Sequence, residues 1–193
     1  MDELKSLAEL LWMLLTEPRT GILLLLLGTA AWTDVRSYRI PNWLTGFGLL
    51  AGLLLSVWNV PHPMQGLMLA FGGVALGLFA LLPLYLIRVL GAGDVKLMAM
   101  VGAFLGLPGT LHALAFVLVT GGLVAIAYAL SRRIGRQVLA NLRQITTSVA
   151  LAAMTGVPAN GLAGFQSAGR VPYGVSICLG TVAYVLAHQL GMA

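Results

Sequence analysis

The chain has 193 residues, of which 59% are hydrophobic and only 9% are charged, and its formal net charge is +5. Soluble globular domains devote about a quarter of their residues to charge, so this composition excludes an ordinary water-facing surface. The single cysteine, Cys178, excludes an internal disulfide and a cysteine-rich zinc site, and we interpret it as a packing residue. In so apolar a chain, we attribute the positive charge to loops beside a membrane and predict no nucleic-acid partner.

The first two predicted helices differ in character. Residues 1–17 predict an interfacial helix, because leucines recur on one helical stripe and Lys5 and Glu9 lie off it. The first membrane span is predicted from Pro18, which suits a first helical turn, to Asp34. The acidic N-terminal segment lacks a basic start and a small-residue cleavage site, so no cleavable signal peptide is expected.

Further apolar segments approach the roughly 20 residues that a helix needs to cross a hydrocarbon core. They are predicted at Trp43–Trp58, Gln65–Ile87, Val95–Leu107, Thr110–Leu130 and Val171–Leu190. Residues 145–163 could span the membrane or lie at its interface, and the sequence leaves both possibilities open. We therefore predict an all-α polytopic membrane bundle of about six transmembrane helices. The whole chain, 1–193, is expected to form one membrane domain, with its transmembrane core at 18–193.

The basic residues gather on one side of this predicted bundle. Nine of the eleven lie in alternate loops or at the adjoining span ends: Arg36, Arg39, Arg88, Lys96, Arg132, Arg133, Arg136, Arg143 and Arg170. The opposite loops carry none, so the positive-inside rule places the basic set in the cytoplasm and both chain termini outside. Anionic lipid headgroups are the expected partners of these basic loops.

Asp34 and Asp94 are the acidic residues of the membrane body. The chain has six acids, and the other four precede residue 18. Both aspartates lie at span ends on the same predicted face, where an ionisable group is costly and usually marks a functional site. A structural role, such as pairing with Arg36 or Lys96, is the alternative.

Two facing carboxylates supply a specific chemistry. They can share a proton, so that one accepts a proton from water while the other donates a hydrogen bond to a scissile carbonyl. This arrangement hydrolyses a peptide bond with neither a metal nor a nucleophilic side chain. Because His62, His112 and His188 are scattered along the sequence, we predict no metal site, no serine triad and no cofactor.

Glycines precede the second aspartate in the run LGAGDVKLMAMVGAF. Because Gly91 and Gly93 lack a Cβ, the backbone before Asp94 can bend sharply and approach a peptide closely. The chain has 24 glycines, so a tight turn that merely needs glycine is the alternative.

Two segments resemble the aspartate motifs of the type IV prepilin peptidases. They are GAGDVKL, from Gly91 to Leu97, and TDVRSYRIPNWLT, from Thr33 to Thr45. In that family the two catalytic aspartates lie at the cytoplasmic ends of helices, the second within Gly-x-Gly-Asp. The run RVPYGVSICLG, from Arg170, is similar to the last helix of the family. Presenilin-type proteases also use Gly-x-Gly-Asp, but their first aspartate typically follows tyrosine, whereas Thr33 precedes Asp34 here.

The resemblance implies roles for individual residues. Asp34 and Asp94 would carry the chemistry, and Gly91 and Gly93 would shape the second catalytic segment. The first loop would be shaped by Pro41 and Asn42, and Lys96 would orient substrate or lipid. A basic residue at a cytoplasmic helix end is by default a lipid-headgroup contact, which is the alternative for Lys96.

Larger family members carry an N-terminal portion with paired cysteine motifs, which is associated with methylation of the new pilin N-terminus. This sequence lacks those cysteines and is more similar to the short peptidases of tight-adherence (Flp) pilus systems; archaeal preflagellin peptidases share the aspartate plan. The resemblance implies an inner-membrane aspartic endopeptidase, without N-methyltransferase activity, that cleaves the cytoplasmic leader of a type IV or Flp prepilin or pseudopilin. A small proton-coupled transporter or a pilus-assembly scaffold is the alternative, which would favour acids near mid-span or broken helices in two repeats.

Overall fold

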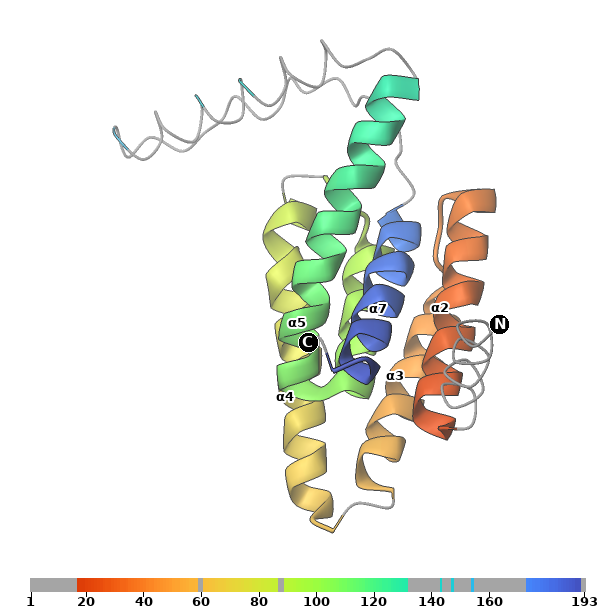
Figure 1. Ribbon diagram of the computed structural model, residues 1–193, viewed down its shortest axis with the longest axis vertical. Coiled ribbons are helices and arrows are strands. Elements are labelled where there is room, and N and C mark those ends of the chain that lie inside the picture. The colour runs from red at the N-terminus through yellow and green to blue at the C-terminus, as the bar shows by residue number, and fades with distance from the viewer. Residues whose placement is uncertain are drawn as a thin grey trace. The chain divides into compact units, whose positions relative to one another are not determined.

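The computed structural model describes residues 17–58, 61–86, 89–131, 143, 147, 154 and 173–191. The regular elements in these ranges are helices: α2 (Pro18–Ser37), α3 (Asn42–Val57), α4 (Pro63–Leu86), α5 (Ala92–Ser131) and α7 (Tyr173–Gln189). The predicted all-α class is confirmed for this part of the chain (Figure 1). The interfacial helix predicted at 1–17 and the open question at 145–163 lie almost wholly outside the described residues.

The chain divides into two units, residues 1–121 with 172–193, and residues 122–171. The first unit contains α2, α3, α4, α7 and the part of α5 up to Gly121. The described residues of the second unit are the last turns of α5 and residues 143, 147 and 154.

Within α5 the chain reverses direction at Gly106, as Figure 1 shows. Gly106 has φ 68° and ψ 179°, a conformation that essentially only glycine adopts, and Pro108 follows it. The break between the spans predicted at Val95–Leu107 and Thr110–Leu130 therefore lies at this glycine. The two arms of α5 run antiparallel, and the first arm also runs antiparallel to α4.

The first arm of α5 is the most buried part of the bundle. Its side chains Leu97, Met98, Met100 and Val101 are all 0% exposed. The arm packs closely on α4, since a Cβ placed on Gly102 would clash with the backbone carbonyl of Gly73. The residue that opens this arm is consequently held by the best-packed helix of the fold.

Two described helices are long and apolar enough to cross a membrane: α4, with mean hydropathy 2.3, and residues 92–128 of α5, with mean hydropathy 2.0. The helix α3 is apolar but shorter. Large apolar side chains on these helices face outward, including Phe71 at 54%, Phe79 at 65% and Leu118 at 58% exposure. Lipid suits such faces, whereas water does not. The number of about six spans and the outside position of the N-terminus stay predictions.

Candidate active site

Asp34 lies in the last turns of α2, on the stripe that faces the bundle interior. The residues Leu23, Leu27, Ala30 and Asp34 recur at helical spacing and are all buried. The helix ends soon after Asp34, because Tyr38 adopts the left-handed conformation and donates its N–H to the Asp34 carbonyl oxygen at 2.8 Å. The Asp34 side chain is 6% exposed. Its carboxylate is thus fixed near a helix end, away from bulk water.

Asp94 lies at the opposite type of helix end, in the first turn of α5. Its carboxylate Oδ2 accepts a hydrogen bond of 2.9 Å from the Gly91 N–H, while its own N–H donates to the Gly91 carbonyl at 3.1 Å. The side-chain bond corresponds to one half of a capping box, in which the third helical residue accepts the N–H of the N-cap residue, and the Gly91 carbonyl takes the place of the missing N-cap side chain. Asp94 is 8% exposed, so it too is a buried acid.

The N-terminus of α7 brings a third element to the two aspartates. The Gly174 N–H donates a 2.8 Å hydrogen bond to Oδ2 of Asp34. The phenol of Tyr173 lies near enough to Asp94 to interact with it electrostatically, and the Asp34 and Asp94 carboxyls also interact with one another. Because the N-terminus of a helix carries a partial positive charge, α7 favours negative charge at this place.

The structure brings the remaining predicted residues to the same end. Lys96 Nζ donates a 2.9 Å hydrogen bond to Oδ1 of Asn42, which joins α5 to the start of α3. Pro41 precedes that helix as its N-cap. A Cβ on Gly93 would lie 3.2 Å from the Cβ of Ile40, so Gly93 lets the GAGD segment pack on the loop between α2 and α3. The other five sequence-predicted site residues therefore lie around Asp34 and Asp94.

Tyr173 and Gly174 were not predicted as site residues. The sequence offered one signal for them, because both lie in the run RVPYGVSICLG, which is similar to the last helix of the prepilin peptidases. A Cβ on Gly174 would lie 2.8 Å from Oδ2 of Asp34 and 3.1 Å from its Cβ. A real Cβ cannot occupy that space, so Asp34 requires glycine here.

The chemical groups at this end are carboxylates, backbone N–H groups and a phenol. In the part of the chain that the structure describes, no group of three or more His, Cys, Asp and Glu gathers to hold a metal ion. His112 and His188 instead flank Tyr184 at the other end of the bundle. A pair of buried acids held by backbone donors is suited to moving protons.

Residues 21–126 match the sequence model of the type IV leader peptidase family. The match covers more than half of the 193 residues and includes Asp34 and Asp94, so the chain belongs to this family. Neither the comparison with curated proteins nor the comparison with solved structures gave a match. Together with the apolar helices, the family identifies the chain as a membrane protein with a type IV leader peptidase-like function. Tyr173 and Gly174 lie outside the matched region.

Proposed function

We propose that the protein is an aspartic endopeptidase that removes the leader of a type IV or Flp prepilin or pseudopilin, with Asp34 and Asp94 as the catalytic pair. The observation that carries the proposal is the meeting of two buried carboxylates, from the end of α2 and the start of α5, at one end of the bundle. They are the acids of the membrane body, and a peptidase family covers both.

The hydrogen bonds suggest how the pair would act. Each aspartate has its Oδ2 held by a backbone N–H, from Gly174 for Asp34 and from Gly91 for Asp94. The Oδ1 atoms are then available to water and to the scissile carbonyl. One carboxylate takes a proton from the attacking water while the protonated partner donates a hydrogen bond to the carbonyl oxygen. The tetrahedral intermediate collapses when the C–N bond breaks and the leaving amine nitrogen receives the proton that the carboxylate took from water.

The location of the site fits a substrate that is itself anchored in the bilayer. Arg36, Arg39 and Lys96 lie at the same end of the bundle as the aspartates, and basic residues of this kind favour the cytoplasmic side of an inner membrane. A prepilin helix in the same membrane would present its leader there. We propose anionic lipid as the further partner of this basic end and expect no nucleic-acid partner.

The proposal covers cleavage and not methyl transfer. The cysteine motifs associated with methylation in larger family members are absent from this sequence, whose single cysteine, Cys178, lies on α7. A transporter or an assembly scaffold is less well supported, because the aspartates lie at helix ends and not near mid-span.

The test is cleavage of a candidate prepilin by the purified protein in detergent, followed by the mass of the product. Asp34→Asn and Asp94→Asn should each lower the rate by at least ~10²-fold, since each removes one member of a proton-transferring pair. Both variants should still accumulate in the membrane. Glu17→Gln is the matched control, because it changes an exposed acid at the other end of α2. Cleavage by either asparagine variant at more than a tenth of the wild-type rate would falsify the catalytic assignment.

A further inference from the structure

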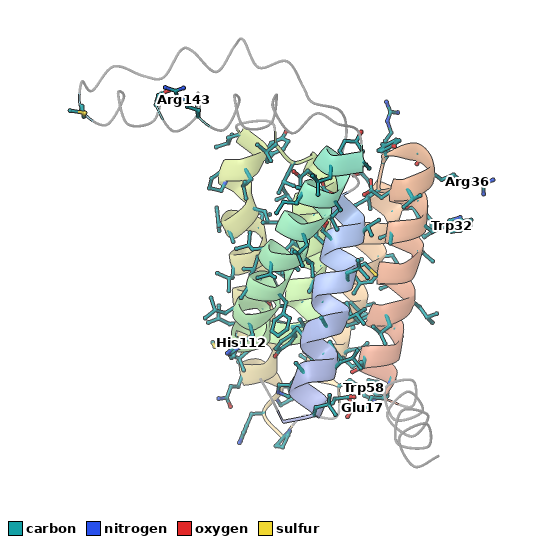
Figure 2. The ribbon with its side chains drawn as sticks, turned by 45° about the horizontal axis from the view of Figure 1, so that its top comes forward. Glu17, Trp32, Arg36, Trp58, His112 and Arg143 are labelled. Carbon is teal, nitrogen blue, oxygen red and sulfur yellow. The ribbon has the colours of Figure 1, made fainter. Side chains whose placement is uncertain are left out.

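A pocket lies at the end of the bundle opposite to Asp34 and Asp94. This pocket has a volume of about 410 Å³ and is lined by Arg19 from the start of α2, by His112 from α5 and by Tyr184 and His188 from the end of α7. In Figure 2, His112 lies toward the same end as Glu17 and Trp58, whereas Trp32 and Arg36 lie toward the other end of α2. Neither Asp34 nor Asp94 lines this pocket.

Arg19 gives the pocket a permanent positive charge with an unsatisfied donor. Its side chain is partly buried, and its Nε is shut off from solvent with no hydrogen-bond partner in the described part of the chain. A buried charged donor without an acceptor is unfavourable. Glu17 attracts Arg19 electrostatically, but the hydrogen bond that its carboxylate accepts comes from the Thr20 hydroxyl at 3.2 Å. The guanidinium can therefore still donate to an anionic oxygen that enters the pocket.

The rim of the pocket adds further donors. The ring of His112 stacks on Tyr184 with centroids 6.0 Å apart, and His188 lies on its other side at 5.8 Å. Nδ1 of His112 lies 2.9 Å from the Pro108 carbonyl oxygen, which can only accept a hydrogen bond, so this nitrogen carries the proton. The ring of His188 carries an N–H donor in either tautomer. Among the described residues that line the pocket, none carries a carboxylate.

The other walls of the pocket are apolar and suit a lipid. Leu69 and Leu105 contribute to them, and Leu69 is 41% exposed on the outer side of α4. Trp58 is 77% exposed at the same end, which is typical of a side chain at a membrane interface. A volume of about 410 Å³ is far larger than the ~30 Å³ share of one water molecule, so it can hold a group larger than a single bridging water.

We propose that this pocket binds a phosphate group, supplied by the headgroup of a membrane phospholipid whose acyl chains lie along the outer side of α4. Arg19 contacts the phosphate oxygens, His112 and His188 contact it from the rim, and the leucines contact the first methylene groups. The site is independent of the proposed peptidase activity. The bound lipid contacts both the start of α2 and the end of α7, and so stabilises the bundle at the end remote from the aspartates.

The test compares lipid-dependent stabilisation in variants inside and outside the pocket. The full-length protein in a neutral detergent is titrated with a short-chain phosphatidylglycerol, and the rise in the midpoint of thermal unfolding is converted into a Kd. Arg19→Gln should weaken the Kd by at least about tenfold, as expected for loss of a charge-assisted hydrogen bond. His188→Gln should weaken the Kd by about threefold or more, and its matched control is His62→Gln, which changes an exposed histidine that does not line the pocket and should leave the Kd within about twofold.

Three results separate the alternatives. If inorganic phosphate stabilises the protein at the same concentrations as the lipid, the ligand is a free anion and the lipid source is wrong. If His62→Gln weakens binding as much as His188→Gln, the lipid does not bind in this pocket and the pocket assignment is overturned. Should Arg19→Gln fail to accumulate, His188→Gln replaces it, with an expected loss of about threefold or more in Kd; an unchanged Kd in that variant contradicts the proposal.

Discussion

The amide N–H of Gly174 donates a 2.8 Å hydrogen bond to the carboxylate of Asp34, which lies 140 residues earlier in the chain. The bond joins the last described helix to the end of the first one. It also places the partial positive charge of the α7 N-terminus against one of the two buried acids. The position of Asp34 is therefore decided by α7 as much as by its own helix.

Gly174→Ala should lower peptidase activity by at least about tenfold. The added Cβ would lie 2.8 Å from Oδ2 and 3.1 Å from Cβ of Asp34, so the carboxylate must move, and misplacement of a catalytic group by about 1 Å can cost ~10²-fold. The measurement is kcat/KM for prepilin cleavage. Gly28→Ala is the control, because nothing lies within 4 Å of a Cβ built on that α2 glycine. Full activity of Gly174→Ala would show that Asp34 does not depend on the α7 contact.

Two roles for Lys96 can be distinguished with variants of Lys96 and Asn42, because a hydrogen bond joins their side chains. If the lysine acts by holding the start of α3, Lys96→Met and Asn42→Ala should each lower kcat/KM by a similar factor, and the double variant should be no worse than either. An exposed pair of this kind contributes about 0.2 to 1 kcal/mol, which corresponds to a loss of up to about fivefold. We expect this non-additive result. Additive losses, with the lysine change acting mainly on KM, would indicate instead that Lys96 contacts the substrate.

The sequence was sufficient to place the two aspartates because acids are rare in the membrane body and the apolar segments define the helix ends. A break between the two apolar runs was also predictable from Pro108 and Gly109, although the residue that reverses the chain is Gly106, a few positions earlier. The contacts of Asp34 with Gly174 and of Lys96 with Asn42 were not predictable from local patterns. They join residues 140 and 54 positions apart, and no periodicity within one helix determines which helix packs beside it.

The roles of Gly91 and Gly93 show a further limit of prediction from the sequence. Their freedom to bend was expected from the sequence, yet each has a particular function in the structure. Gly91 donates its N–H to Asp94, and Gly93 leaves room for Ile40. A pattern of glycines indicates that space or an unusual bend is needed, but only the neighbouring backbone determines what fills the space.

Metal chelators and thiol reagents should leave the peptidase activity unchanged within about twofold. The proposed chemistry needs two carboxylates and water, and Cys178 lies on α7 as the single cysteine. The measurement is the cleavage rate after incubation with a chelator or with a maleimide. Inhibition by the chelator that is reversed by one added metal would contradict a mechanism that uses the aspartates alone. Inhibition by maleimide is checked with Cys178→Ser, which should be resistant if the reagent acts at that thiol.

The two ends of the bundle should face different compartments. In a Cys178→Ser background, a cysteine replacing Arg36 should resist an impermeant thiol reagent added to intact cells, and a cysteine replacing His62 should react with it. The reason is that basic residues gather at the aspartate end, while both positions are exposed on the protein. Lysed cells provide the control, in which both cysteines should react. Labelling at position 36 alone in intact cells would put the proposed active site outside.

Gly106→Ala should destabilise the protein through its backbone and not through a steric clash. The glycine has φ 68° and ψ 179°, whereas the nearest atom to an added Cβ, the Cβ of Leu69, lies at an ordinary 3.6 Å. Holding a residue with a side chain in this conformation costs about 1 to 3 kcal/mol. For a chain of this size, such a loss lowers the midpoint of thermal unfolding by on the order of 5 °C.

The local structure leaves Gly106 little room to relax. Its carbonyl oxygen accepts a 2.5 Å hydrogen bond from the hydroxyl of Thr110, which is 0% exposed, so the start of the second arm is held to the reversal. Thermal unfolding in detergent measures the effect, with Gly28→Ala as the control for adding a methyl group to a helix of the same protein. Because alanine favours helices, the control should unfold at the same temperature or slightly higher. An equal midpoint for both variants would show that the two arms of α5 can reverse direction without the glycine conformation.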